Sequence, residues 1–201
     1  MATELFLASS NAGKLAEYQK LAEGAGCEED LQLQLLPEFA SLPSFEENAP
    51  TFAENAAGKA LHYSRLCDKR VFADDSGLVV PELGGAPGVI SARYAGPGAS
   101  DAQKMAKLLA ELRDQRGAQR SAYFVCAIAL AERGRVQAVI TARADGEITE
   151  QQRGSGGFGY DPIFFFPPVK KTFAELSAEE KNRYSHRGKA FRRMLAALNQ
   201  S

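Results

Sequence analysis

The stretch that most constrains this chain is residues 71–78, VFADDSGL, where an apolar, β-prone run meets two adjacent carboxylates and then a Ser-Gly pair. This pattern predicts a buried strand whose end opens into a site. Neighbouring side chains of an extended strand point to opposite faces, so Asp74 and Asp75 have different roles unless the strand has already ended. We expect one to hold a metal ion or water and the other to satisfy backbone donors. The alternative is an ordinary Asp-Ser-Gly turn after a structural strand.

Length and charge limit the possible classes of protein. The 201 residues, 45% of them hydrophobic, are enough for a sizeable core, and we expect one domain over residues 1–201. A formal net charge of −1 provides no basic field for a polynucleotide, so we expect no nucleic-acid partner. The sequence shows neither a basic leader nor an apolar span of membrane length. These features predict a cytoplasmic protein without a membrane partner.

The cysteines support neither a disulfide framework nor a zinc site. Cys27, Cys67 and Cys126 are odd in number, far apart, and without C-x-x-C or Cys/His spacing. A reducing compartment is the simpler expectation.

The N-terminal part has the pattern of a strand followed by an anion-binding helix. Residues 4–8 predict a short strand, and Ser9-Ser10-Asn11 predicts the N-cap of a helix that reaches about Ala25. Gly13 and Lys14 fall in its first turn, where free N–H groups, the helix dipole and the lysine charge all favour a phosphate. The spacing is not that of a Walker A loop, and a capped helix start with a surface lysine is the alternative.

The next segment contains a candidate metal ligand. Leucines alternating with glutamines over 31–35 predict a half-buried strand, and Thr51-x-x-Glu54 predicts the start of a helix that reaches about Leu66. Glu47, in the loop before that helix, offers a hard oxygen ligand to a divalent ion shared with Asp75. The alternative for Glu47 is a solvated loop carboxylate without a metal. Lys59, on the predicted helix, is likewise ambiguous, because a single lysine on such a helix is usually a solvated surface residue.

The middle of the chain predicts a loop, a helix and a hairpin. Glycine and proline over residues 84–96 indicate a shaped loop, and Ser100-x-x-Gln103 predicts a capping box before a helix. Residues 121–131 are apolar on both faces, which is typical of a central strand. Arg133-Gly134-Arg135 predicts a tight turn into an antiparallel partner strand over 136–142.

A glycine-rich stretch, GSGGFGYDPIFFF over 154–166, is the second informative segment. Its glycines would let the backbone approach a flat ligand, and Phe158 or Tyr160 offers a stacking face that suits a nucleobase. The alternative is a glycine-rich turn that leads into an apolar strand. Ser185 predicts the N-cap of a last helix, which places His186 and Arg187 at its positive end.

Six ordered blocks give the chain a family resemblance. It resembles the inosine/xanthosine triphosphate pyrophosphatase family, which hydrolyses non-standard purine nucleoside triphosphates. The resemblance implies an α/β fold with a mixed, twisted sheet flanked by helices, two lobes with the nucleotide site in the cleft between them, and a homodimer. One departure is Ala142, where the family commonly has glycine. The matching blocks are SSNAGK (9–14), TFAENAAGKA (51–60), FADDSGL (72–78), LGGAPGVISARYAG (83–96), GSGGFGYDPIFF (154–165) and EEKNRYSHRGKA (179–190).

The resemblance also implies the roles of individual residues. Asp75 would be the catalytic base, with Asp74 beside it, and Glu47 and Asp75 would bind Mg²⁺. Attack at the α-phosphorus would release pyrophosphate and a nucleoside monophosphate. The implied substrate-binding residues are Ser9, Ser10, Asn11, Ala12, Gly13, Lys14, Lys59, Ser76, Phe158, Gly159, Tyr160, Asp161, Lys181, His186 and Arg187.

Donors at the His186-Arg187 helix start would pair with the keto oxygen of a 6-keto purine and would face the amino donor of adenine.

Three other functions stay open at this point. The first is a related pyrophosphatase that prefers modified pyrimidine or methylated nucleotides, and the second is a nucleotide sensor without turnover. The third, a nucleic-acid-binding module, is disfavoured by the charge balance.

Overall fold

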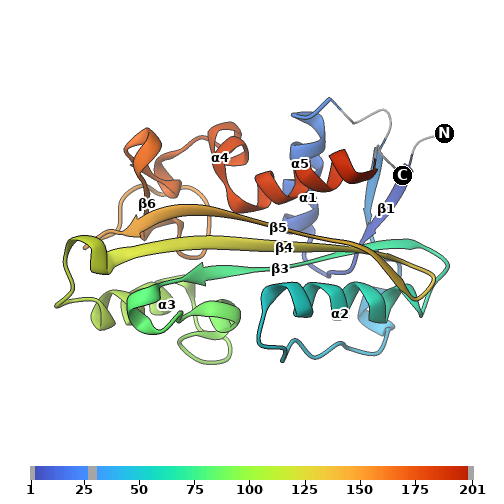
Figure 1. Cartoon of the computed structure of the whole chain (residues 1–201), viewed down its shortest axis with the longest axis horizontal. Helices are drawn as coiled ribbons and strands as arrows, with labels where there is room; N and C mark the ends of the chain where they lie inside the picture. The colour runs from blue at the N-terminus through green and yellow to red at the C-terminus, as the bar shows by residue number, and fades with distance from the viewer. Residues whose placement is uncertain (1–2, 27–30, 199–201) are drawn as a thin grey trace. The chain divides into compact units, whose positions relative to one another are not determined.

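The computed structural model describes residues 3–26 and 31–198, so Cys27 lies outside the described residues. The described strands form one seven-stranded sheet in the order β2-β1-β3-β4-β5-β6-β7 (Figure 1). Both β2 and β3 pair with β1 in parallel, whereas β6 pairs antiparallel with β5 and β7. The predicted mixed sheet of an α/β fold is therefore confirmed. The strands are β1 (Thr3–Leu7), β2 (Leu31–Leu35), β3 (Arg70–Val79), β4 (Ser121–Glu132), β5 (Arg135–Ile148), β6 (Phe164–Phe166) and β7 (Lys171–Thr172).

Five α-helices are present in the described parts of the chain. Asn11 and Thr51 cap the first two as predicted, and the capping boxes at Ser100 and Ser177 are both formed. None of the described helices has the length and apolar character needed to cross a membrane. The helices are α1 (Ala12–Glu23), α2 (Phe52–Ser64), α3 (Asp101–Glu111), α4 (Ala178–Tyr184) and α5 (His186–Leu198).

Strand β3 corrects one prediction. It continues through Ser76 and Gly77 to Val79, so the turn expected after the two carboxylates is absent from this described segment. Because the strand stays extended, Asp74 and Asp75 point to opposite faces of the sheet. The parallel partner β1 ends at Leu7, which pairs with Phe72, so both carboxylates lie just beyond the carboxyl end of β1. Ligands of α/β proteins usually bind at this kind of edge.

The chain divides into two compact units. Unit 1 comprises Met1–Asp75, Cys126–Ala142 and Arg187–Ser201, and unit 2 comprises Ser76–Val125 and Arg143–His186. Strands β3, β4 and β5 contribute residues to both units. The single domain over 1–201 stays a prediction.

Unit 1 buries apolar side chains on both faces of its part of the sheet. Helices α1 and α5 cover one face and α2 covers the other (Figure 1). Tyr18 packs between Phe72 and Phe191 in the first layer, and Ala142 lies in the same cluster. The second layer uses small residues such as Ala56 and Ala73, which let α2 approach the sheet closely. Helix α1 ends at Glu23, two residues before the predicted end near Ala25, and Ala25 is exposed.

Unit 2 has its own aromatic core. Phe124, Phe164 and Phe173 pack together with ring centroids 4.6–5.9 Å apart. The β4–β5 turn, in unit 1, has φ of 49° at Arg133 and 71° at Gly134, as a two-residue hairpin requires. Strand β5 extends six residues beyond the predicted end at Ala142, to Ile148.

The buried Arg120 links two elements of unit 2 by hydrogen bonds. Arg120 is 7% exposed and donates hydrogen bonds to the carbonyls of Leu112, Ile148 and Thr149 at 2.7, 2.7 and 2.6 Å. These carbonyls belong to the end of α3 and the end of β5, so one guanidinium satisfies acceptors on two elements.

Replacing Arg120 with methionine is expected to lower the free energy of unfolding by about 2 kcal/mol, because it leaves buried carbonyls without donors. For a chain of this size the midpoint of thermal unfolding should fall by roughly 4–8 °C. Arg113→Met is the matched control, since the Arg113 side chain is 79% exposed. Equal midpoints for the two variants would contradict the role given to Arg120.

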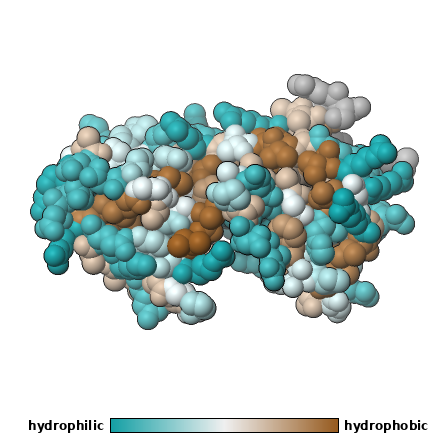
Figure 2. All heavy atoms as spheres, turned by 60° about the horizontal axis from the view of Figure 1, so that its bottom comes forward, coloured by the Kyte–Doolittle hydropathy of each residue, from teal (hydrophilic) through white to brown (hydrophobic). Residues whose placement is uncertain are grey.

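The face shown in Figure 2 is mainly hydrophilic, and hydrophobic side chains reach it in several separate places. Phe158 is a large hydrophobic residue whose side chain is strongly exposed, at 56%. Leu66, Ile90, Val136 and Val139 are exposed to between 39% and 43%. Phe158 lies in the glycine-rich stretch for which the sequence predicts a stacking role.

Candidate active site

Asp74 lies at the centre of a buried charge cluster in unit 1. Its Oδ1 accepts a hydrogen bond from Lys14 Nζ at 2.9 Å, and its Oδ2 lies 3.4 Å from Arg187 Nη2. Arg187 also donates to Glu17 at 2.6 Å. Burial alone would raise the pKa of Asp74, but the charges of Lys14 and Arg187 outweigh burial and hold that pKa well below its usual range. Asp74 is therefore a permanent anion that positions two cations.

The start of α1 offers donors on the same side of the sheet. Asn11 accepts a hydrogen bond from the backbone N–H of Lys14, and its own N–H donates to Ser9 Oγ. Residues 10–13 are exposed. A helix start that is open to solvent, with a lysine in its first turn, is suited to bind phosphate.

Asp75 faces α2, on the opposite side of β3. It is 8% exposed, and its Oδ2 accepts a hydrogen bond from Asn55 Nδ2 at 3.0 Å. Burial raises the pKa of Asp75 to about 6; the Asn55 hydrogen bond opposes that rise, and the negative charge of Glu47 adds to it. A carboxylate with this pKa is ionised at neutral pH and can still accept a proton, as a general base must.

Lys59 connects the acidic residues of unit 1. It forms an ion pair with Glu47, and its Nζ donates to the backbone carbonyl of Asp74 at 3.1 Å. The predicted residues Glu47, Lys59, Asp74 and Asp75 are thus gathered at the same edge of the sheet.

The carboxylate oxygens of Glu47 and Asp75 in unit 1 are suitable ligands for a hard cation that takes few ligands from the protein. Glu47 is close enough for its charge to raise the pKa of Asp75, and both residues offer carboxylate oxygens. No group of three or more His, Cys, Asp or Glu side chains is placed to hold a metal within residues 3–26 and 31–198. Mg²⁺ commonly takes one or two carboxylates and completes its shell with water and substrate phosphates, so two carboxylates are sufficient.

Unit 2 gathers a second group of predicted residues. Asp161 is 3% exposed, accepts the backbone N–H of Phe158 at 2.8 Å, and pairs with Lys181 at 2.5 Å. The Lys181 ammonium lies 4.4 Å from the centre of the Phe158 ring. Tyr160 instead has a buried ring whose hydroxyl donates to the Ser91 carbonyl, so Phe158 is the one of these two aromatics whose ring is exposed.

The glycines of this stretch are needed by the protein itself. A Cβ on Gly157, where φ is +71°, would lie 2.1 Å from Asp161 Oδ2, and one on Gly154 would meet the backbone of Ala174 at 2.5 Å. Glycine is therefore required at these two positions because the backbone there packs against Ala174 and Asp161 of the same chain. This supports the alternative of a glycine-rich turn at Gly154 and Gly157. Gly159 has open space around it, and its N–H donates to Asp101.

The remaining predicted residues are partly or fully buried. The His186 ring, which is 7% exposed, stacks on Phe124 with centroids 4.7 Å apart. Arg187 is 3% exposed and uses Nη1 and Nη2 on Glu17 and Asp74. Ser76 is half-buried on β3. Recognition of the 6-keto group by His186 and Arg187 stays a prediction.

Two residues of the unit 1 cluster were missed by the sequence reasoning. Asn55 lies four residues before Lys59 on α2, and Glu17 lies three residues after Lys14 on α1. Each therefore shares a helix face with a residue that was predicted. The available signal was a polar residue at this spacing, which alone does not separate a site residue from a solvated one.

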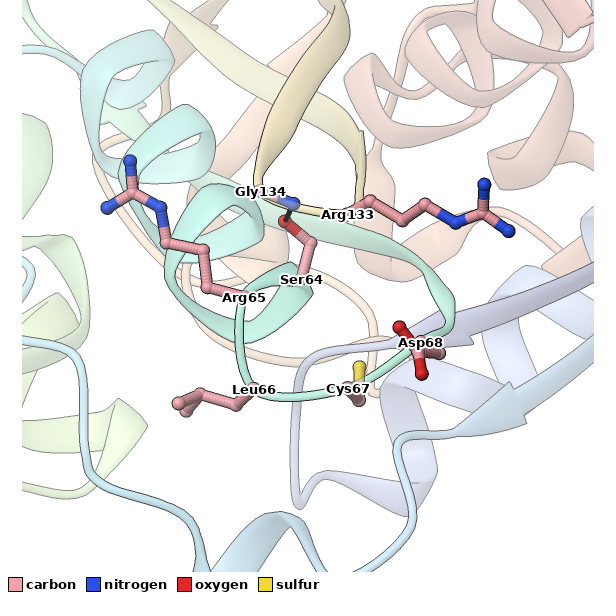
Figure 3. A pocket seen from close by; sticks show the side chains of 7 residues that line it. All are labelled: Ser64, Arg65, Leu66, Cys67, Asp68, Arg133 and Gly134. Carbon is pink, nitrogen blue, oxygen red and sulfur yellow. Dashed lines mark hydrogen bonds between the residues drawn. The ribbon is translucent and has the colours of Figure 1, made fainter.

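A separate pocket of unit 1 lies between the end of α2 and the β4–β5 turn (Figure 3). Ser64 Oγ accepts the backbone N–H of Gly134 there. The side chains of Arg65 and Arg133 extend to opposite sides, so they do not converge on one anion (Figure 3). The described residues that line this pocket include none of the predicted site residues.

Comparison with known proteins gives consistent matches. The model of the Ham1 family matches residues 5–197. The chain is 50% identical to the dITP/XTP pyrophosphatase of Geobacillus kaustophilus over 95% of this chain and 92% of that protein. It is 48% identical to the dITP/XTP pyrophosphatase of Gloeobacter violaceus over 97% and 94% of the two chains.

Solved structures of Ham1 proteins also match this chain. The HAM1 protein from Coxiella burnetii matches with a TM-score of 0.88 and 42% identity, covering 99% of this chain and 100% of that one. The Staphylococcus aureus Ham1 protein matches with a TM-score of 0.86 and 37% identity, over 98% and 99% of the two chains. These matches confirm the resemblance found in the six sequence blocks. The chain belongs to the Ham1 family.

Proposed function

We propose that this chain is a Mg²⁺-dependent nucleoside triphosphate pyrophosphatase that hydrolyses non-standard purine nucleotides (dITP, ITP and XTP or dXTP) to the monophosphate and pyrophosphate. The observation that carries the proposal is the cluster in unit 1, where the buried Asp75 lies beside Glu47 and a set of cations. The names of the dITP/XTP pyrophosphatases that it matches at 42–50% identity support the substrate class.

The proposed roles divide the reaction into phosphate binding and water activation. Residues Ser9 to Lys14 and the Lys59 ammonium bind the triphosphate, and Glu47 and Asp75 hold Mg²⁺. The ion, when bound, neutralises charge on the phosphate oxygens. Asp75 orients or deprotonates the attacking water. Asp74, whose pKa is low, is a poor proton acceptor, and its contact with Lys14 and Arg187 favours a positioning role.

We propose that residues of unit 2 recognise the base, and that Arg187 contributes to substrate binding. Phe158 supplies the stacking face, Gly159 and Tyr160 supply backbone groups, and Ser76, Asp161, Lys181 and His186 contribute polar contacts. The rigid pairing of Asp161 with Lys181 and with the Phe158 N–H supports this assignment, because it fixes the segment before substrate binds.

Two further properties belong to the proposal. The protein is expected to act as a homodimer in the cytoplasm. Thiols that remain free at Cys67 and Cys126 are compatible with a reducing compartment. Sedimentation equilibrium of the purified chain tests the dimer.

The proposed function is tested by pyrophosphate release from dITP, XTP, dGTP and dATP, with and without Mg²⁺. Rapid, metal-dependent release from dITP and XTP is the expected result. Binding of dITP without turnover would favour the nucleotide sensor instead. Turnover of modified pyrimidine or methylated nucleotides in place of dITP would keep the chemistry and overturn the assigned base specificity.

Replacing Phe158 with alanine is expected to raise KM for dITP about tenfold, because stacking on one aromatic ring contributes roughly 1–3 kcal/mol per base. The thermal midpoint should hardly change, since the ring is 56% exposed. Phe158→Tyr is the matched control and should keep the KM of the unmodified protein. An unchanged KM in the alanine variant would remove Phe158 from the base site.

A further inference from the structure

Asn55 is a buried polar residue of α2 whose side chain contacts two other segments of unit 1. It is 1% exposed. Its Nδ2 donates to Asp75 Oδ2 at 3.0 Å and to the carbonyl of Ala49 at 3.4 Å, and its Oδ1 accepts the N–H of Ala49 at 2.9 Å. One amide group therefore joins β3 to the loop that precedes α2.

These contacts fix the orientation of the amide. If it were rotated by 180°, its oxygen would face the carboxylate of Asp75 and the carbonyl of Ala49, and its nitrogen would face a donor. Within the described chain, Oδ1 of Asp75 has no hydrogen-bond partner. The Asn55 contact thus holds the carboxylate in one orientation and leaves its other oxygen for a ligand.

The loop contact extends this effect to the second acid. Ala49 lies two residues after Glu47, and both of its backbone polar groups are held by Asn55. Lys59, one turn further along α2, pairs with Glu47 itself. Lys59 therefore brings charge to the cluster, whereas the neutral Asn55 sets the positions of the segments that carry Glu47 and Asp75.

We propose that Asn55 is a positioning residue for the divalent cation, holding Asp75 and the Glu47 loop at the spacing that the ion requires. This inference rests on the proposed function, which assigns Glu47 and Asp75 as the Mg²⁺ ligands. Partners that hydrogen-bond to metal ligands typically change metal affinity by about 10–100-fold when they are removed.

The test uses Mn²⁺ as the probe, with free Mn²⁺ measured by electron paramagnetic resonance during titration of the full chain without nucleotide. Asn55→Ala should weaken Mn²⁺ binding by about 10–100-fold. Asn48→Ala is the matched control and should bind like the unmodified protein, because Asn48 is an exposed asparagine next to Glu47. Asp75→Asn should lose the site.

The outcomes separate the inference from the function on which it rests. A folded Asn55→Ala protein with unchanged Mn²⁺ affinity would overturn the inference alone. Equal Mn²⁺ binding by the unmodified protein and Asp75→Asn would overturn the metal assignment in the proposed function. Asn55→Ser, which keeps a hydroxyl for the Ala49 N–H, is measured in parallel, with folding checked by circular dichroism. Failure of both Asn55 variants to fold would also overturn the inference, since the side chain would then be required for the fold itself.

Discussion

Replacing Asp75 with asparagine is expected to lower kcat for dITP by about 1000-fold or more, because the change removes both the proton acceptor and an anionic metal ligand. The side chain keeps its size, and its amide oxygen can still accept the hydrogen bond from Asn55 that the carboxylate accepts at 3.0 Å. The measurement is pyrophosphate release at saturating Mg²⁺. Residual activity within tenfold of the unmodified protein would mean that another group activates the water.

The same substitution should stabilise the protein when metal is removed. Because burial raises the pKa of Asp75 from 3.8 to about 6, the charged carboxylate destabilises the folded state above pH 6. Below about pH 4 the group is protonated in both the folded and the unfolded state, and this cost disappears. We expect Asp75→Asn to raise the free energy of unfolding by roughly 1–2 kcal/mol at pH 7.5 in EDTA, and to show no such gain near pH 4.

Urea unfolding at the two pH values measures this difference. Asp145→Asn is the matched control, since it removes the same charge from a side chain that is 65% exposed. A loss of stability in Asp75→Asn at pH 7.5 would contradict the stated cause of the raised pKa.

The two carboxylates show how far the local sequence can predict the site. The alternation of side chains along a strand predicted separate roles for Asp74 and Asp75, and the structure places cations on one and Asn55 on the other. The predicted turn at Ser76 was wrong because tertiary contacts override local preference. Ser91, thirteen residues after Leu78, accepts the Leu78 N–H at 3.0 Å and donates to the Gly88 carbonyl at 2.6 Å, and this contact helps to keep this part of β3 extended.

Long-range contacts mark the limit of the prediction. Lys14 was identified from its place in a helix start, which is a local pattern. Its partner Asp74 is 60 residues away, and Arg187 meets Glu17 across 170 residues. Such long-range pairs cannot be predicted from the spacing of residues within one helix or strand. The aromatic residues are similar in this respect: Phe158 and Tyr160 are equivalent in the sequence pattern, and only packing shows that the Tyr160 ring is buried.

Replacing Asp74 with asparagine is expected to lower the free energy of unfolding at pH 7 by about 3–5 kcal/mol, because it removes one of the carboxylates that pair with the buried charge of Arg187. Lys14→Met breaks the other pair of Asp74 and should also destabilise the protein, because it removes a cation that compensates the buried Asp74 carboxylate. The loss should be smaller than in Asp74→Asn, since the Lys14 side chain is 26% exposed whereas that of Arg187 is 3% exposed. Chemical denaturation of the two variants compares the pairs directly.

The dependence on pH gives this last prediction a second test. The pKa of Asp74 is lower in the folded protein than in the unfolded chain, so its contribution to stability is present above about pH 4 and is lost as the pH falls below that value. The difference in unfolding free energy between the unmodified protein and Asp74→Asn should therefore narrow as the pH falls from about 4 toward 2. A constant difference across this range would show that the asparagine acts through packing, and the charge pairing of Asp74 with Lys14 and Arg187 would then not be what stabilises this edge of the sheet.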